Sequence, residues 1–252
     1  MTSAMNGGGV SAIVLTGDEE AQIGDCLRHL SWANEVLVVD SGSTDATRDI
    51  AAGSGARIVQ QAWQGFAAQR NFGAAQAAHD WVLFVDADER ITSELAAEIP
   101  AVLRSPKYAG YHIPMRNSMF GRWMRYGGLG RQYHLRLYNR TRGRWVRDVH
   151  EVVELDGPAG SLHAAMEHYA YRTIRELLEK VDRYTDAEAR ALRDRGARPT
   201  PGIILRDCLG LFLYKYFWQR GCLDGYPGLL WAGSLSYYNL LKWMKLWELS
   251  RS

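Results

Sequence analysis

The chain reads Trp81-Val-Leu-Phe-Val-Asp86-Ala-Asp88-Glu-Arg90, a short apolar run that ends in two aspartates one residue apart. Five apolar residues rich in Val and aromatic side chains predict a buried strand. A strand that ends in Asp-x-Asp presents both carboxylates at its C-terminal edge. Because side chains alternate along a strand, Asp86 and Asp88 are expected to point the same way.

Two interpretations of these acids stay open at this point. Hard oxygen ligands on one side suit Mg²⁺ or Mn²⁺, which keep waters and take further oxygens from substrate phosphates. Alternatively, the acids are turn residues that cap the helix expected to begin near Thr92. This stretch alone does not distinguish a metal site from a helix cap, so the rest of the sequence is needed.

The segments before this stretch alternate between short apolar runs and amphipathic patterns. Such an alternation predicts right-handed crossovers and a mostly parallel sheet flanked by helices, the α/β class. We expect strands at residues 10–15, 35–39, 56–59 and 81–85, and helices from residue 23, at 46–52 and at 66–78.

Acidic side chains follow three of these predicted strands. They are Glu19 or Glu20 after the first strand, Asp40 after the second, and Asp86 with Asp88 after the fourth. In parallel sheets, ligands bind beyond the carboxyl ends of the strands. Carboxylates can accept hydrogen bonds from ribose and base, while a diphosphate needs a metal and cations. The pattern therefore favours a nucleotide site.

Each of these residues also has a simpler structural interpretation. Asp40 can form an Asx turn before a helix, and Gly42 can serve only to allow a positive φ. Arg70, which could reach the phosphates, can instead be a solvated charge on a helix. Taken together with the acids, they favour nucleotide binding.

Three motifs now resemble a known family. They are Val38-Val-Asp40-Ser-Gly-Ser-Thr-Asp45, Gln69-Arg-Asn-Phe-Gly73 and Val82-Leu-Phe-Val-Asp86-Ala-Asp88-Glu, in this order and spacing. They resemble the family 2 glycosyltransferases of GT-A fold, across residues 12–99. The chain is most similar to the bacterial subgroup that adds glucose to the inner core of lipopolysaccharide.

The resemblance implies a UDP-sugar donor and a divalent metal, Mg²⁺ or Mn²⁺. Its DxD motif corresponds to Asp86 and Asp88, with Asp88 as the firmer metal ligand. One departure is that Thr16-Gly-Asp18-Glu stands where the family commonly has Asn before Glu, so Asp18, Glu19 or Glu20 could bind the ribose. The residues implied to bind the nucleotide-sugar are Thr16, Glu19, Asp40, Gly42, Arg70, Asp86 and Ala87.

Residues 106–170 change to a pattern of strands and turns, expected at 108–115, 133–138 and 145–155. Nine arginines and no acid lie between Arg116 and Arg147, so this part should face something anionic. We interpret it as the acceptor-binding half.

An inverting transfer needs a carboxylate that takes the proton of the acceptor hydroxyl. The candidates are Glu151 and Asp148, and the resemblance favours Glu151 because it places the base near a His-Glu pair. Arg136 and Arg147 are candidates for contacts with acceptor phosphates or the leaving diphosphate. His150 could join them, or be a hydrogen-bonded loop histidine.

The C-terminal part is predicted to be helical. Residues 173–192 have the spacing of a long amphipathic helix. Residues 203–249 hold four of the nine tryptophans and five tyrosines together with basic residues. This composition fits helices at a membrane interface, while an oligomer interface or a cover for the core is the alternative. The run at 203–218 carries charges and is too short to span a bilayer.

Length and composition fit one α/β domain with an appendage. The 252 residues are 47% hydrophobic with a net charge of +2, and Cys26, Cys208 and Cys222 form no disulfide or zinc pattern. A cytosolic location, peripheral on the inner face of the cytoplasmic membrane, is expected. The expected parts are a disordered lead-in (1–9), a nucleotide-sugar-binding half (10–105), an acceptor-binding half with the catalytic base (106–170) and a helical extension (171–252).

The sequence therefore predicts a metal-dependent inverting glycosyltransferase that moves a sugar, expected to be glucose, from a UDP-sugar to a lipopolysaccharide-core or lipid-linked acceptor. Within the same class, the alternative acceptor is a polyprenyl phosphate or an exopolysaccharide intermediate. A nucleotidyltransferase usually has a basic, glycine-rich phosphate loop, whereas Asp18-Glu-Glu20 is acidic. A non-catalytic sugar-nucleotide-binding protein is disfavoured by the paired aspartates and Glu151. Nucleic-acid binding lacks a reading motif.

Overall fold

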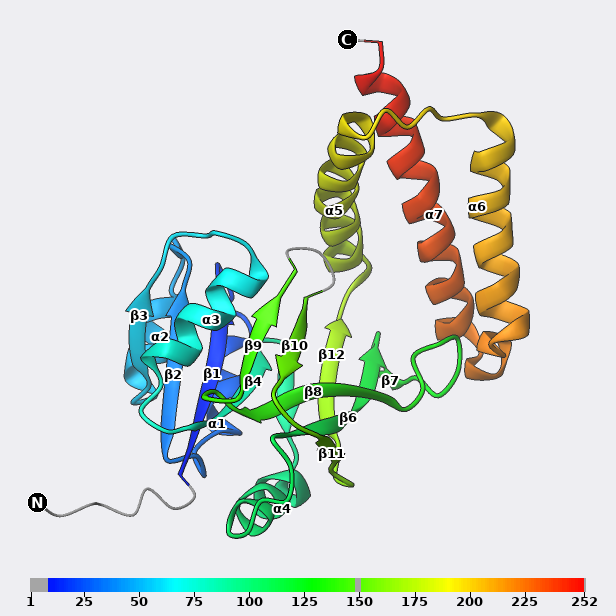
Figure 1. The fold of residues 1–252 in the computed structure, drawn as a ribbon. Coiled ribbons are helices and arrows are strands. Elements are labelled where there is room, and N and C mark those ends of the chain that lie inside the picture. The colour runs from blue at the N-terminus through cyan, green and yellow to red at the C-terminus, as the bar shows by residue number, and fades with distance from the viewer. Residues whose placement is uncertain (1–8, 148–150, 252) are drawn as a thin grey trace, which may run out of the picture. The chain divides into compact units, whose positions relative to one another are not determined.

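The chain folds into two compact units. One comprises Met1–Met115 and Gln132–His168, and the other Arg116–Arg131 and Tyr169–Ser252. The computed structural model describes residues 9–147 and 151–251, so most of the predicted lead-in lies outside the described residues. Figure 1 shows the strands and helices of each unit.

The first unit begins with four parallel strands in the order β3-β2-β1-β4. These are β1 (Val10–Thr16), β2 (Glu35–Asp40), β3 (Arg57–Gln60) and β4 (Trp81–Asp86). The helices between them are α1 (Ile23–Arg28), α2 (Thr47–Gly53) and α3 (Phe66–Gln76). The predicted α/β fold with a parallel sheet and flanking helices is confirmed (Figure 1).

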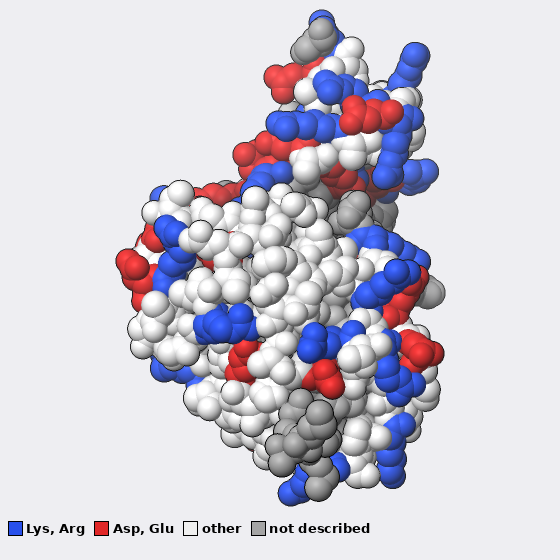
Figure 2. All heavy atoms as spheres, turned by 60° about the vertical axis from the view of Figure 1, so that its left-hand side comes forward, with Lys and Arg blue, Asp and Glu red and all other residues white. Residues whose placement is uncertain are grey.

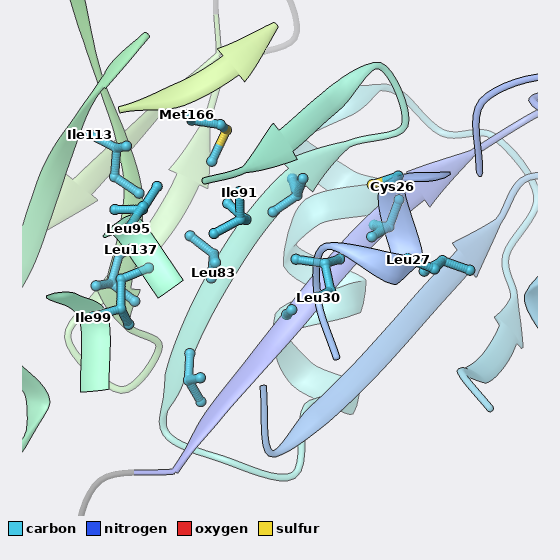
Figure 3. Packing of buried hydrophobic residues seen from close by; sticks show 14 of the residues in the cluster. Cys26, Leu27, Leu30, Leu83, Ile91, Leu95, Ile99, Ile113, Leu137 and Met166 are labelled. Carbon is cyan, nitrogen blue, oxygen red and sulfur yellow. The ribbon is translucent and has the colours of Figure 1, made fainter. Parts of the chain in front are cut away.

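The two faces of this parallel sheet pack against different helices. Val14 and Leu83 belong to a cluster with Leu27 of α1 and Leu95 of α4 (Ser93–Leu103). Figure 3 shows this cluster, including Leu27, Leu83 and Leu95. On the opposite face, Ile13, Phe84 and their neighbours pack against α3. Alternate residues of one strand are thus buried on opposite faces, which explains why these strands read as continuous apolar runs.

Beyond β4 the sheet continues in the order β8-β6-β12-β5. The bounds are β8 (Gln132–Asn139), β6 (Gly110–Met119), β12 (Met166–Tyr171) and β5 (Glu89–Ile91). The β4–β8, β8–β6 and β12–β5 pairs are antiparallel, and β11 (Ala159–Ser161) pairs with β6. The parallel half is thus extended beyond β4 by strands that pair mainly in antiparallel fashion.

The predicted single strand at 145–155 is wrong. The structure has two antiparallel strands there, β9 (Gly143–Val146) and β10 (Val152–Leu155). Arg147, which follows β9, has a φ of +70°. A positive φ is incompatible with an extended strand, and the alternating apolar residues on both sides concealed this interruption.

The second unit is mainly helical, as predicted for the C-terminal region. It contains β7 (Arg122–Trp123), α5 (Ile174–Asp194), α6 (Pro201–Leu213) and α7 (Tyr226–Leu249). Helix α7 packs against both α5 and α6. A small core of Ala189, Trp243 and Leu246 joins them. Within the described part of the chain, no helix has the length and apolarity required to cross a membrane.

Charged side chains of both signs are scattered over the face of the molecule drawn in Figure 2. This agrees with a formal net charge of only +2 for the whole chain. Both signs of charge therefore occur on this face.

Candidate active site

The loop after β2 is built around Asp40, whose side chain is fully buried. Its carboxylate accepts hydrogen bonds from the backbone N–H groups of Gly42 (3.0 Å) and Ser43 (3.1 Å), from the Ser43 hydroxyl (2.5 Å) and from Thr16 Oγ1 (3.3 Å). Gly42 has a φ of +103°. The Asx turn considered from the sequence is therefore present, and Asp40 fixes the shape of the loop. Contact of Asp40 with a nucleoside stays a prediction.

Two of the three acids after β1 also hold this loop. Asp18 Oδ1 accepts from the backbone N–H of Thr44 at 2.7 Å, and Glu20 Oε2 accepts from that of Ala46 at 3.1 Å. The backbone N–H of Glu19 donates to Thr47 Oγ1 at 2.8 Å. The acids at the ends of β1 and β2 are thus brought together as expected from parallel strands.

Asp86, at the end of β4, lies between two arginines. Its Oδ1 is 3.0 Å from Nη2 of Arg70, and its Oδ2 is 2.8 Å from Nη2 of Arg136. Burial would raise the pKa of Asp86, but Arg136 and Arg70 outweigh it and hold the pKa well below its usual range. Asp86 is therefore ionised, and one of its roles is to position both guanidinium groups.

Glu89 is a site residue to which the sequence argument assigned no role. Its side chain is buried, accepts from Arg136 Nη2 at 2.8 Å, and accepts from the backbone N–H of Asp86 at 2.8 Å. Burial raises the pKa of Glu89 to about 7, with Arg136 opposing the rise and Asp86 adding to it. The sequence feature that could have indicated a role for Glu89 is that it directly follows Asp88. What the sequence could not reveal is that this charged residue is buried.

Asp88 lies in the turn after β4, because the strand ends at Asp86. Its Oδ2 is 3.5 Å from Nε2 of His168 on β12. The antiparallel pairing of β12 with β5, which sets His168 opposite Glu89, creates this proximity. The expectation that strand alternation sets the two acids on one side does not apply, because the strand ends at Asp86 and Asp88 lies in the turn. Both acids nevertheless interact electrostatically with His168.

The alternative of a helix cap is excluded for both aspartates. Helix α4 is capped by Thr92, whose side chain accepts from the backbone N–H of Leu95 at 3.2 Å. The second candidate role, metal binding, fits the donor set, since Asp88 offers oxygen and His168 offers nitrogen, both ligands of Mn²⁺-type cations. Within residues 9–147 and 151–251 there is no group of three His, Cys, Asp or Glu side chains arranged to hold a metal.

Arg70 of α3 connects Asp86 with Glu151. Its buried guanidinium lies 3.6 Å from Glu151 Oε1 and over the ring of Trp145 at 4.7 Å. Nε and Nη1 of Arg70 have no hydrogen-bond partner within the described part of the chain. The sequence alternative of a solvated helix charge is wrong, because Arg70 is only 3% exposed. Two buried donors of a permanent cation therefore lack a partner among the described residues.

These residues line a cavity of about 460 Å³. Arg70, Asp86, Arg136 and Glu151 contribute the charged groups, and Trp145 lies on one wall. His134 also lines it; burial, assisted by the charge of Arg136, lowers the pKa of this histidine to about 4. The buried cations of such a cavity can bind an anion, and the carboxylate of Glu151 can accept a proton beside that anion.

The remaining predicted residues have separate outcomes. Asp148 and His150 lie outside the described residues. Arg147 is exposed, and the structure gives it no ion pair with a described residue. Ala87 is buried, and its carbonyl accepts from Arg90 Nη1 at 2.7 Å.

Replacing Arg136 by methionine is expected to lower the free energy of unfolding by about 3 kcal/mol. The substitution leaves Glu89 buried without its cation and removes one of the two partners of Asp86. Urea denaturation measures the loss. The control is Arg144→Met, because Arg144 and Glu154 form an exposed pair that should contribute less than about 1 kcal/mol. Equal losses in the two variants would contradict the structural role of Arg136.

A parallel sheet covered on both faces, with acids at its carboxyl edge, is typical of α/β enzymes that bind nucleotides. The sequence profile of glycosyl transferase family 2 matches residues 11–154, more than half of this chain. The chain belongs to that family.

Relatives that match almost the whole chain include two glycosyltransferases. An uncharacterized glycosyltransferase of Rickettsia bellii is 29% identical over 255 residues, covering 96% of this chain and 87% of that protein. The lipopolysaccharide core biosynthesis glycosyltransferase LpsC of Rhizobium meliloti is 27% identical over 248 residues, covering 95% of this chain and 92% of that protein.

A solved structure also matches in part. Glucosyl-3-phosphoglycerate synthase of Mycobacterium tuberculosis, in complex with Mn²⁺, UDP and glucosyl-3-phosphoglycerate, is 26% identical with a TM-score of 0.37. The match spans 46% of this chain and 45% of that one, less than half of either. A similarity this low identifies no ligand for this chain.

Proposed function

We propose that this protein is an inverting glycosyltransferase that moves a sugar, expected to be glucose, from a UDP-sugar to a lipopolysaccharide-core or other lipid-linked acceptor. The observation that carries the proposal is the cavity in which Arg70 lies between Asp86 and Glu151. Membership of family 2 supports sugar transfer, and the similarity to LpsC supports an acceptor of the lipopolysaccharide core.

The donor side of the site consists of the strand ends of the parallel half. Thr16, Asp40 and Gly42 form a loop of fixed shape that would hold the nucleoside in one orientation. Glu19 and Ala87 complete the predicted contacts with the nucleotide-sugar. The free donors of Arg70 would bind the diphosphate, because a guanidinium forms strong, charge-assisted hydrogen bonds with phosphate oxygens.

Asp88 and His168 would hold the divalent cation, with Asp86 as the other predicted ligand. When bound, such a cation offsets the negative charge that develops on the departing diphosphate. The close approach of Asp88 to His168 supports this assignment.

Glu151 would act as general base on the acceptor hydroxyl. The acceptor oxygen then bonds to the anomeric carbon while the bond from that carbon to UDP breaks, so no covalent enzyme intermediate forms. The position of Glu151 in the cavity, on the C-terminal side of the β9–β10 connection, supports this role. Asp148 is the reserve candidate. A lipid-linked acceptor also implies peripheral contact with the inner face of the cytoplasmic membrane.

A thermal-shift screen of nucleotide sugars tests the donor class. A UDP-sugar with Mn²⁺ or Mg²⁺ is expected to raise Tm by about 5 °C or more at roughly 100 times its Kd. UDP-glucose should give the largest shift, and omission of the cation should reduce it. Stabilisation by nucleoside triphosphates and by no UDP-sugar would instead favour a nucleotidyltransferase. Binding of UDP-sugar without transfer to lipopolysaccharide-core acceptors would favour a non-catalytic protein.

A further inference from the structure

The turn between α6 and α7 carries large apolar side chains that are exposed. It consists of a π-helical turn, Tyr214–Trp218, and a 3₁₀ turn, Gly221–Asp224. Trp218 is 80% exposed and Tyr226, the first residue of α7, is 70% exposed. Phe217 and Leu223 are exposed as well. We call these four residues the aromatic tip. A cluster of this kind is uncommon on a soluble surface and marks an interaction site.

Helix α6 extends this surface. None of the residues of α6 is buried. Leu205, Leu209 and Leu213 are exposed at intervals of four residues and lead to Phe217 in the tip. Residues four apart lie on the same side of a helix, so these side chains form one continuous apolar ridge.

A cavity of about 640 Å³ lies in the same unit, and Tyr226 of the tip is one of its lining residues. Phe120, Ile174 and Leu230 provide apolar wall, while Arg122 and Arg172 provide positive charge. The backbone N–H of Phe120 donates to the carbonyl of Tyr171 at 2.8 Å. This bond fixes the segments that carry the two arginines next to each other.

Neither Arg122 nor Arg172 forms an ion pair with a described carboxylate. Asp224 also lines the cavity, but its carboxylate accepts hydrogen bonds from the backbone N–H groups of Arg125 (3.1 Å) and Tyr126 (2.8 Å). The cavity therefore combines an apolar wall with cations available to an anionic ligand.

We propose that this cavity binds the phosphate group of a membrane lipid while the aromatic tip inserts into the lipid interface beside it. Guanidinium groups bind phosphate oxygens through paired hydrogen bonds, and Trp and Tyr side chains favour the headgroup region of a bilayer. Lys215 and Arg220, within and next to the tip turns, add attraction to an anionic surface. The inference rests on the peripheral membrane contact of the proposed function, and it is independent of sugar transfer.

Flotation of the full chain with lipid vesicles, without any nucleotide sugar, tests this site. The wild-type protein should bind phosphatidylcholine vesicles more strongly when phosphatidylglycerol is included. Each basic residue at an anionic surface strengthens binding by about fivefold. The double variant Arg122→Ala/Arg172→Ala should therefore bind the anionic vesicles about 25-fold more weakly. Phe217→Ser/Trp218→Ser should lose binding to both kinds of vesicle, and since all four positions lie at the surface, their melting curves should be unchanged.

The matched control is Arg195→Ala/Arg198→Ala, which removes the same charge from exposed positions after the other end of α5. Helix α5 has 21 residues, which corresponds to about 30 Å, well beyond the range of surface electrostatics at physiological salt. This variant should bind like the wild type. An equal loss in the control would overturn the assignment of the cavity.

Two further measurements test whether the cavity binds a soluble phosphate or the aromatic tip binds a second copy of the chain. If inorganic phosphate raises the Tm of the wild type but not of the arginine variant, and no vesicles bind, the ligand is a soluble phosphoryl group and the lipid proposal is wrong. If the lipid-free chain is a dimer that Phe217→Ser/Trp218→Ser dissociates, and no vesicles bind, the tip is an interface between copies. If the wild-type chain binds vesicles as expected but transfers no sugar from any UDP-sugar, only the proposed function is overturned.

Discussion

Replacing Asp88 by asparagine is expected to lower sugar transfer from a UDP-sugar by about 10³-fold or more. The substitution keeps the size of the side chain but removes the negative charge that would hold a divalent cation beside His168. Charge stabilisation by a catalytic metal amounts to several kcal/mol of the barrier. Initial rates at increasing Mn²⁺ concentration measure the effect, and the variant should need more Mn²⁺ than the wild type for any remaining activity.

A matched control for Asp88 is Asp80→Asn, which changes an exposed aspartate just before β4 that pairs with Arg140. This variant should transfer sugar at the wild-type rate, because its carboxylate lies at the opposite end of the strand. Unchanged turnover and unchanged Mn²⁺ dependence in Asp88→Asn would show that Asp88 is not a metal ligand.

Replacing Glu151 by glutamine should reduce kcat by about 10²- to 10⁴-fold, the usual contribution of a general base. Glutamine has the same shape but cannot accept the proton of the acceptor hydroxyl. The KM for the UDP-sugar should change little, since the loss concerns the chemical step. Steady-state kinetics with both substrates varied separates kcat from KM.

The control for Glu151 is Glu154→Gln in the same hairpin, where Glu154 is exposed and pairs with Arg144. It should have wild-type kinetics. Asp148→Asn tests the reserve candidate in the same assay. Near-normal transfer by Glu151→Gln together with inactive Asp148→Asn would reassign the base to Asp148.

The parallel half of the fold was predictable because its signals are local. Three of the four apolar runs are followed within a few residues by an acid, as at Asp40 and Asp86. A short, continuous apolar run indicates a strand that is buried on both faces of a sheet. The helical nature of the C-terminal part was equally visible, since amphipathic spacing persists over the length of α5.

The rest of the site depends on contacts between distant segments. His168 reaches Asp88 only because β12 pairs with β5, and no local pattern near His168 indicates that pairing. The burial of Glu89 depends on Arg136, which comes from β8 and supplies its charge partner. Strand register and charge pairing across a sheet are properties of the assembled fold, so residue spacing alone does not specify them.

The guanidinium of Arg70 contacts an acid at the end of β4 and an acid beside β10 at the same time. These two acids carry the donor and acceptor roles of the proposed reaction, yet they share one cation. A substitution at either acid changes the electric field at the other, so the free-energy effects of the two substitutions should not sum. Because of this thermodynamic coupling, the donor side and the acceptor side of the site behave as one unit. A substitution selected for a new acceptor would therefore also change how the site binds the donor.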